Sequence, residues 1–124
     1  MGPRDIQERT FAFGVRVVEL IDRMPRTLAG ETIAKQLIRS GTSVGSNMQE
    51  ADGAESKKDF IHKVSVAYKE VRESRHWLAT IRATIMKEDA EVIALWQESD
   101  ELVRILFAIL RNARQSPDRP HYSQ

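Results

Sequence analysis

The fold of this chain is decided by residues 36 to 51, which read Gln-Leu-Ile-Arg-Ser-Gly-Thr-Ser-Val-Gly-Ser-Asn-Met-Gln-Glu-Ala. Apolar and small residues recur here every three or four positions, the spacing of one helix face: Ile33, Leu37, Gly41, Val44, Met48 and Ala51. Each glycine inside a helix costs about 1 kcal/mol relative to alanine, so Gly41 and Gly45 make this a poor helix by propensity alone. The unbroken period still predicts a helix, held at the centre of the fold by tertiary packing. The alternative is a loop from Ser40 to Asn47.

Three further amphipathic segments surround this stretch, and the sequence predicts helices over about residues 5–24, 28–51, 56–86 and 89–114. Pro25 should end the first helix, and Thr27 and Ser56 are suitable N-caps for the next two. The third helix carries the most regular heptad, formed by Phe60, Val64, Ala67, Val71, Ser74, Leu78, Ile81 and Ile85. Residues 115–124 are expected to form a mobile tail. The prediction is an all-α protein, an antiparallel up-down-up-down four-helix bundle.

The composition is that of one soluble globular domain covering residues 1–124, with 41% hydrophobic and 30% charged residues. There is no cysteine, which excludes a disulfide framework and thiolate metal sites. No apolar run approaches the roughly 20 residues that span a bilayer, and the N-terminus lacks the apolar core of a signal peptide. We therefore expect a cytoplasmic protein with no membrane partner and no cofactor.

The formal net charge is only +1, but charge is unevenly distributed along the chain. Residues 54 to 87 hold eight Lys and Arg against four Asp and Glu, whereas residues 88 to 101 hold six acids and no base. The simplest interpretation is that both segments are solvated helix faces; the alternative is that they pair across a helix hairpin or dock copies of the chain. The bases of the third predicted helix are the candidate nucleic-acid contacts: Lys57, Lys58, Lys63, Lys69, Arg72, Arg75 and Arg82.

A polar row lies beside the central apolar face and is formed by Arg39, Ser43, Asn47 and Glu50. We expect Arg39 to pair with Glu70 or Glu73 on the third helix, because a buried arginine needs a carboxylate partner. The alternative is a polar surface patch used by a partner.

The first predicted helix has a second apolar face, formed by Phe11, Val15 and Val18. An isolated bundle would leave this face exposed, so the sequence predicts a homo-oligomer that covers it.

One pattern has the spacing of a metal site. Glu73 and His76 form a Glu-x-x-His, which in di-metal bundles occurs twice and is completed by a Glu from each of two other helices. The other histidines, His62 and His121, do not follow a glutamate by three. No metal site is therefore predicted, and no catalytic residue is assigned.

In the order and spacing of several residues, this sequence resembles the 23S rRNA intervening sequence proteins, which are small bacterial four-helix bundles. The resemblance covers roughly residues 8 to 110 and is carried by Gln36-Leu37-x-Arg39-Ser40, Ser43-Val44-x-x-Asn47-Met48-x-Glu50-Ala51, Ser56-x-x-Asp59-Phe60, Ala67, Glu70, Glu73 and Trp77-Leu78. It implies a homopentamer with no established catalytic residues. The family is also similar to accessory proteins of diversity-generating retroelements, which bind a reverse transcriptase and nucleic acid.

Three hypotheses for the function follow. The first is a non-catalytic oligomeric scaffold that binds RNA or DNA, the second is an accessory protein that binds a reverse transcriptase or another protein, and the third is a metal-binding bundle enzyme. The missing ligands count against the third.

Overall fold

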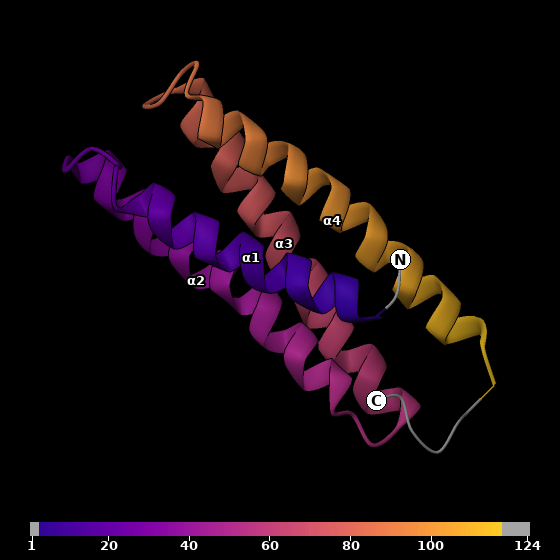
Figure 1. Cartoon of the computed structure of the whole chain (residues 1–124). Coiled ribbons are helices and arrows are strands. Elements are labelled where there is room, and N and C mark those ends of the chain that lie inside the picture. The colour runs from indigo at the N-terminus through magenta and orange to yellow at the C-terminus, as the bar shows by residue number, and fades with distance from the viewer. Residues whose placement is uncertain (1–2, 118–124) are drawn as a thin grey trace.

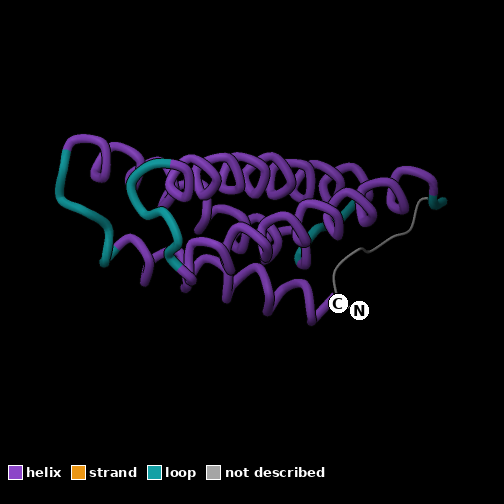
Figure 2. The backbone as a smooth tube through the Cα atoms, turned by 90° about the horizontal axis from the view of Figure 1, so that it is seen from above, coloured by secondary structure: helices purple, strands orange, loops and turns teal. Residues whose placement is uncertain are grey.

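Four helices make up the computed structural model, which describes residues 3–117: α1 (Pro3–Ile21), α2 (Leu28–Asp52), α3 (Lys57–Ala83) and α4 (Ala90–Gln115). Short links join them, so each helix runs antiparallel to the one before (Figures 1 and 2). The α1–α2 and α3–α4 links lie at one end of the molecule and the α2–α3 link at the other. The predicted up-down-up-down four-helix bundle is confirmed.

The helix starts follow from side-chain caps. The Thr27 hydroxyl accepts a hydrogen bond from the N–H of Gly30, and the Ser56 hydroxyl accepts one from the N–H of Asp59. Asp89 caps α4 by accepting from the N–H groups of Glu91 and Val92. Each cap satisfies backbone donors that have no partner within the helix.

Two helices end earlier than the sequence predicts. α1 ends at Ile21 rather than Met24, because the residue before Pro25 is forced out of the helical region and the chain tightens into a turn. α3 ends at Ala83 rather than residue 86, and the link to α4 places Glu88 in the left-handed region at φ 65°. Gln115 still belongs to α4, and residues 118–124 of the predicted mobile tail lie outside the described residues.

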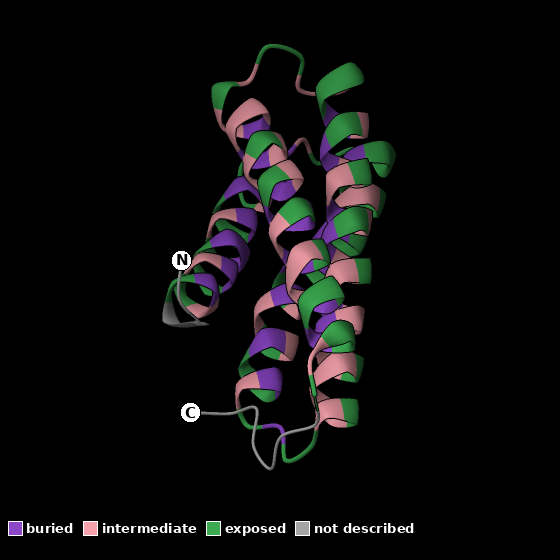
Figure 3. Ribbon diagram, turned by 90° about the vertical axis from the view of Figure 1, so that its right-hand side faces the viewer, coloured by how far each residue is buried: buried purple, intermediate pink, exposed green. Residues whose placement is uncertain are grey.

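One hydrophobic core is shared by all four helices, and buried residues line their inward faces (Figure 3). Its largest fully buried side chains are Phe13, Val17, Leu20, Leu37, Val44, Val64, Val71, Leu78, Ile81, Leu95, Leu102 and Leu106. Most pairs of adjacent helices pack along much of their length, whereas α1 and α4 touch least. No helix within residues 3–117 is long and apolar enough to cross a membrane.

The predicted helix through Gly41 and Gly45 is confirmed, since α2 is continuous from Leu28 to Asp52. The glycines allow α1 to lie close against it. A Cβ atom at Gly41 would lie 2.9 Å from Cγ2 of Val17, and one at Gly45 would lie 3.1 Å from the carbonyl oxygen of Thr10. Packing of α1 at this distance offsets the low helix propensity of the two glycines.

Candidate functional site: a polar cluster and the basic face of α3

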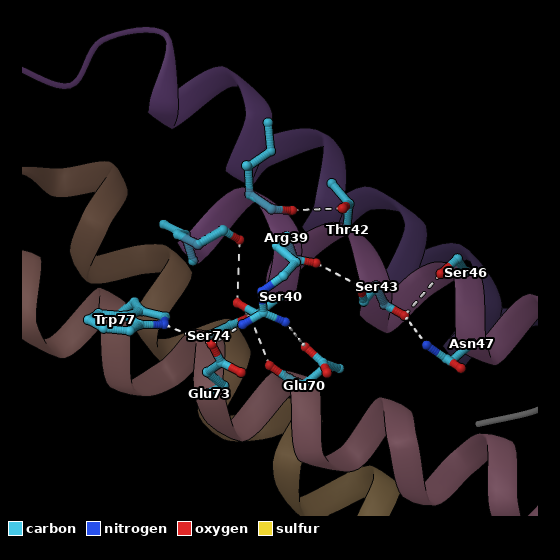
Figure 4. A network of polar contacts seen from close by, with 12 residues as sticks. Arg39, Ser40, Thr42, Ser43, Ser46, Asn47, Glu70, Glu73, Ser74 and Trp77 are labelled. Atoms are coloured by element: carbon cyan, nitrogen blue, oxygen red, sulfur yellow. Dashed lines mark hydrogen bonds and ion pairs between the residues drawn. The ribbon is translucent and has the colours of Figure 1, made fainter. Parts of the chain in front are cut away.

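Arg39 of α2 lies between two carboxylates of α3 (Figure 4). Its Nη1 is 3.0 Å from Oε1 of Glu70, and its Nη2 pairs with Glu73. Glu73 also accepts a hydrogen bond from Nε1 of Trp77 at 3.1 Å. The Arg39 side chain is nonetheless 49% exposed, so this cluster lies at the surface of the α2–α3 seam rather than in the core.

Beneath this cluster two serine hydroxyls meet inside the bundle. Oγ of Ser40 and Oγ of Ser74 are 2.8 Å apart, and both residues are fully buried. Ser74 also donates to the carbonyl oxygen of Glu70, one turn earlier on α3. Sequence reasoning placed Ser74 in the core heptad but missed this pair. The available signal was a polar residue on the apolar face of each of two adjacent helices, because buried hydroxyls need partners.

The rest of the predicted polar row does not join this cluster. The Ser43 hydroxyl donates to the carbonyl oxygen of Arg39, and Nδ2 of Asn47 donates to that of Ser43. Glu50 instead pairs with Lys63 of α3, with 2.6 Å between Oε1 and Nζ. The row therefore divides into local bonds along α2 and two separate contacts to α3.

The bases of α3 also divide into paired and exposed groups. Lys57 donates to the carbonyl oxygen of Ser116, Lys63 pairs with Glu50, and Nη1 of Arg75 is 2.8 Å from Oδ1 of Asp100. The hydrogen bond from Lys63 to Glu50, with the nearby negative charge, raises the pKa of Lys63. The exposed group consists of Lys58, Lys69, Arg72 and Arg82.

The acids at the start of α4 pair mainly with α1 and not with α3. Three arginines spaced by seven residues, two on α1 and one in the α1–α2 link, pair with acids of α4 and its N-cap. Arg9 pairs with Glu98 at 2.7 Å, Arg16 with Glu91 at 3.0 Å, and Arg23 with Asp89 at 3.2 Å. The pKa of Asp89 is lowered mainly by the hydrogen bond from Arg23 and, to a smaller extent, by the hydrogen bond from the N–H of Val92. The predicted pairing across the α3–α4 hairpin is represented by Arg75 and Asp100.

A shallow bowl of about 450 Å³ opens on the outward face of α3 beside α4. Lys69 and Arg72 lie on its α3 side, and the indole of Trp96 contributes from α4. The guanidinium carbon of Arg72 lies 5.5 Å from the centre of the Tyr68 ring. This cation–π contact holds the guanidinium group over the ring. The remaining lining residues are Glu73, Arg75, His76 and Ala79.

An apolar groove of about 510 Å³ lies between α1 and α2. The predicted interface residues line its α1 side, with Phe11 71%, Val15 41% and Val18 45% exposed. Gly14 and Gly45 form part of its floor together with Thr10, Thr42, Ser46 and Gln49. Apolar side chains thus remain in contact with solvent along one face of the bundle.

The Glu-x-x-His pattern of α3 is already engaged in other contacts. Glu73 binds Arg39 and Trp77, and the ring of His76 lies edge-on to that of Trp77, with 4.9 Å between centres. His62 is exposed, and His121 lies outside the described residues. In the described part of the chain no three histidines or acids are grouped so that they could hold a metal ion.

Comparison with known proteins identifies the family. The sequence profile of the 23S rRNA-intervening sequence proteins matches residues 4–108. The chain belongs to this family. Among solved structures, this 23S rRNA-intervening sequence protein is similar to a protein of unknown function from the S23 ribosomal protein family of Bacteroides thetaiotaomicron. The two share 31% identity with a TM-score of 0.74, over 86% of this chain and 98% of the other. None of the curated proteins compared with it matches.

Proposed function

We propose that this protein is a non-catalytic, self-associating cytoplasmic scaffold that binds nucleic acid through the exposed bases of α3. The observation that carries the proposal is the placement of the acids of α4. Asp89 pairs with Arg23 of the α1–α2 link and Glu91 with Arg16 of α1, so they do not neutralise the outward bases of α3. The family's name, which refers to 23S rRNA, is consistent with a nucleic-acid partner.

The charges on α3 favour contacts to phosphate over reading of sequence. Lys69, Arg72 and Arg82 are exposed and form no ion pair with any acid among residues 3–117 in the structure. Long basic side chains on one helix face bind the phosphate backbone of any sequence. Repetition of this face around an oligomer would concentrate positive charge that a single chain of net charge +1 does not display.

Self-association is supported by the apolar groove between α1 and α2. Phe11, Val15 and Val18 form a contiguous exposed apolar surface, which is typical of a surface that another protein covers. By family resemblance, the assembly proposed is a homopentamer. Light scattering should return a particle several times larger than 14.2 kDa, and Val15→Asp should reduce its size. A wild-type monomer at micromolar concentration would contradict self-association and leave the groove available to a reverse transcriptase or another protein.

Nucleic-acid binding is tested by fluorescence anisotropy with a short RNA hairpin in a salt titration. Affinity should fall with a log–log slope of about −0.9 per phosphate contact on a duplex. Changing Lys69, Arg72 and Arg82 together to Glu should abolish binding. Arg75 is left unchanged because it holds Asp100 of α4.

The matched control is Arg26→Glu, which reverses an exposed charge in the α1–α2 link without touching α3. It should bind the hairpin nearly as well as the wild type. Absence of binding at about 50 mM salt, or equal loss in the control and the triple variant, would rule out this surface.

A further inference from the structure

The bowl beside Trp96 combines features that the proposed function does not require. Binding of phosphate needs only exposed bases, yet this bowl also has an aromatic wall and a volume of about 450 Å³. That volume is within the range of about 300–1,000 Å³ of pockets that enclose small ligands. We propose that the bowl holds an unpaired nucleotide, with its base against Trp96 and its phosphates on Lys69 and Arg72. This inference rests on the proposed function and specifies its ligand as single-stranded nucleic acid.

The charges around the bowl leave two bases available for phosphate. Arg75 is held by Asp100 at 2.8 Å, and the carboxylate of Glu73 is held by Arg39 and by Nε1 of Trp77. The charges of Arg75 and Glu73 are therefore largely balanced by their own partners. Lys69 and Arg72 lie on the same rim, three residues apart on α3, and so project from neighbouring positions of one helix face. Two cations at this spacing suit two oxygens of one phosphate or two successive phosphates.

The two tryptophans of the chain have different environments. Nε1 of Trp77 is bonded to Glu73 and its ring lies edge-on to His76, so Trp77 belongs to the polar cluster at the α2–α3 seam (Figure 4). Trp96 lines the bowl from α4 and is only partly buried. Of the two tryptophans, Trp96 is therefore the one that a ligand on Lys69 and Arg72 can reach.

The aromatic wall favours an unpaired base over a duplex. In a duplex the faces of the bases are covered by their stacked neighbours, and only phosphates and groove edges are exposed. A single strand can turn a base out and stack it on an aromatic side chain while basic residues follow the backbone. Stacking tolerates any base, so the site should show little sequence preference.

Tryptophan fluorescence can test this inference, because the chain has only two tryptophans. In Trp77→Phe the fluorescence arises from Trp96 alone, and in Trp96→Phe from Trp77 alone. A short oligouridylate should quench Trp77→Phe saturably and leave Trp96→Phe nearly unchanged, at about 50 mM salt. A blunt RNA duplex of the same length should quench neither. Circular dichroism verifies that both variants remain folded.

Affinity measurements test the same inference without fluorescence. Trp96→Leu should weaken binding of the oligouridylate about tenfold and leave duplex binding unchanged. Lys69→Gln with Arg72→Gln should weaken binding of both nucleic acids. Equal binding of single strand and duplex, with Trp96 emission unaffected, would overturn the inference and leave the proposed function standing. Failure of both nucleic acids to bind would overturn the proposed function as well.

Discussion

Gly41→Ala tests whether glycine sets the distance between α1 and α2. In an unobstructed helix interior this change stabilises by about 1 kcal/mol. Here the new Cβ would lie 2.9 Å from Cγ2 and 3.0 Å from Cγ1 of Val17, which is fully buried. A β-branched side chain has few rotamers with which to move aside, so α1 must shift, and overpacking of this kind costs about 1–3 kcal/mol. The net result should lie between no change and a loss of about 2 kcal/mol in the free energy of unfolding.

Gly14→Ala is the matched control on the facing helix. Its added Cβ would meet Cα of Thr42 at 3.4 Å, an ordinary van der Waals contact, so most of the gain in helix propensity should be retained. Because that gain is common to both changes, the difference between the two variants measures crowding and should be about 1–3 kcal/mol. Urea unfolding followed by circular dichroism, at one fixed protein concentration, gives both values.

A double-mutant cycle with Val17 identifies the cause. Val17→Ala removes the two nearest atoms, Cγ1 and Cγ2, and leaves Cβ of residue 17 at 3.2 Å, so Gly41→Ala should be more favourable in that background than in the wild type. The coupling free energy should be within the range of about 0.5–3 kcal/mol found for residues in contact. The reasoning fails if Gly41→Ala raises the urea midpoint as much as Gly14→Ala does. It also fails if the effect of Gly41→Ala is the same with and without Val17.

Substitutions at Leu78, Asp89 and Glu88 test separate parts of the structure. Leu78 is fully buried in the core, so Leu78→Ala should cost about 2–5 kcal/mol in urea unfolding, and a wild-type midpoint would show that the core face of α3 is assigned wrongly. Asp89→Ala removes both the α4 cap and the ion pair with Arg23, so it should cost more than Asp89→Asn, which keeps a capping oxygen. The cap accounts for about 0.5–2 kcal/mol. The pKa of Asp89 is lowered in the folded protein, so its negative charge stabilises the fold above the ordinary pKa of 3.8. The stability advantage of the wild type over Asp89→Asn should therefore disappear as the pH falls below that value. An advantage that persists at the lowest pH would contradict this assignment. Glu88 has a φ of 65°, so Glu88→Gly should raise the thermal midpoint by relieving left-handed strain. Ala79→Gly, at an exposed position in the interior of α3, should lower it.

The local sequence was sufficient to predict the helices and the bundle. The three-and-four spacing of Leu37, Val44 and Met48 continues through the glycines, and helical periodicity requires only neighbouring residues. The caps at Thr27 and Ser56 could also be predicted from local sequence, because each capping side chain bonds to a residue only three positions away in the chain.

Apart from the pairing of Arg39 with Glu70 and Glu73, which the sequence predicted, only the tertiary structure decided which polar groups meet. The acids at the start of α4 lie in sequence next to the bases of α3, but they pair with Arg16 of α1 and Arg23 of the α1–α2 link, on the other side of α4. Likewise Ser40 and Ser74 bond to each other across α2 and α3, which neither helix reveals alone. An amphipathic pattern fixes which face of a helix points inward. The rotation and offset of the adjacent helices then determine which side chains at the edges of that face come within bonding distance.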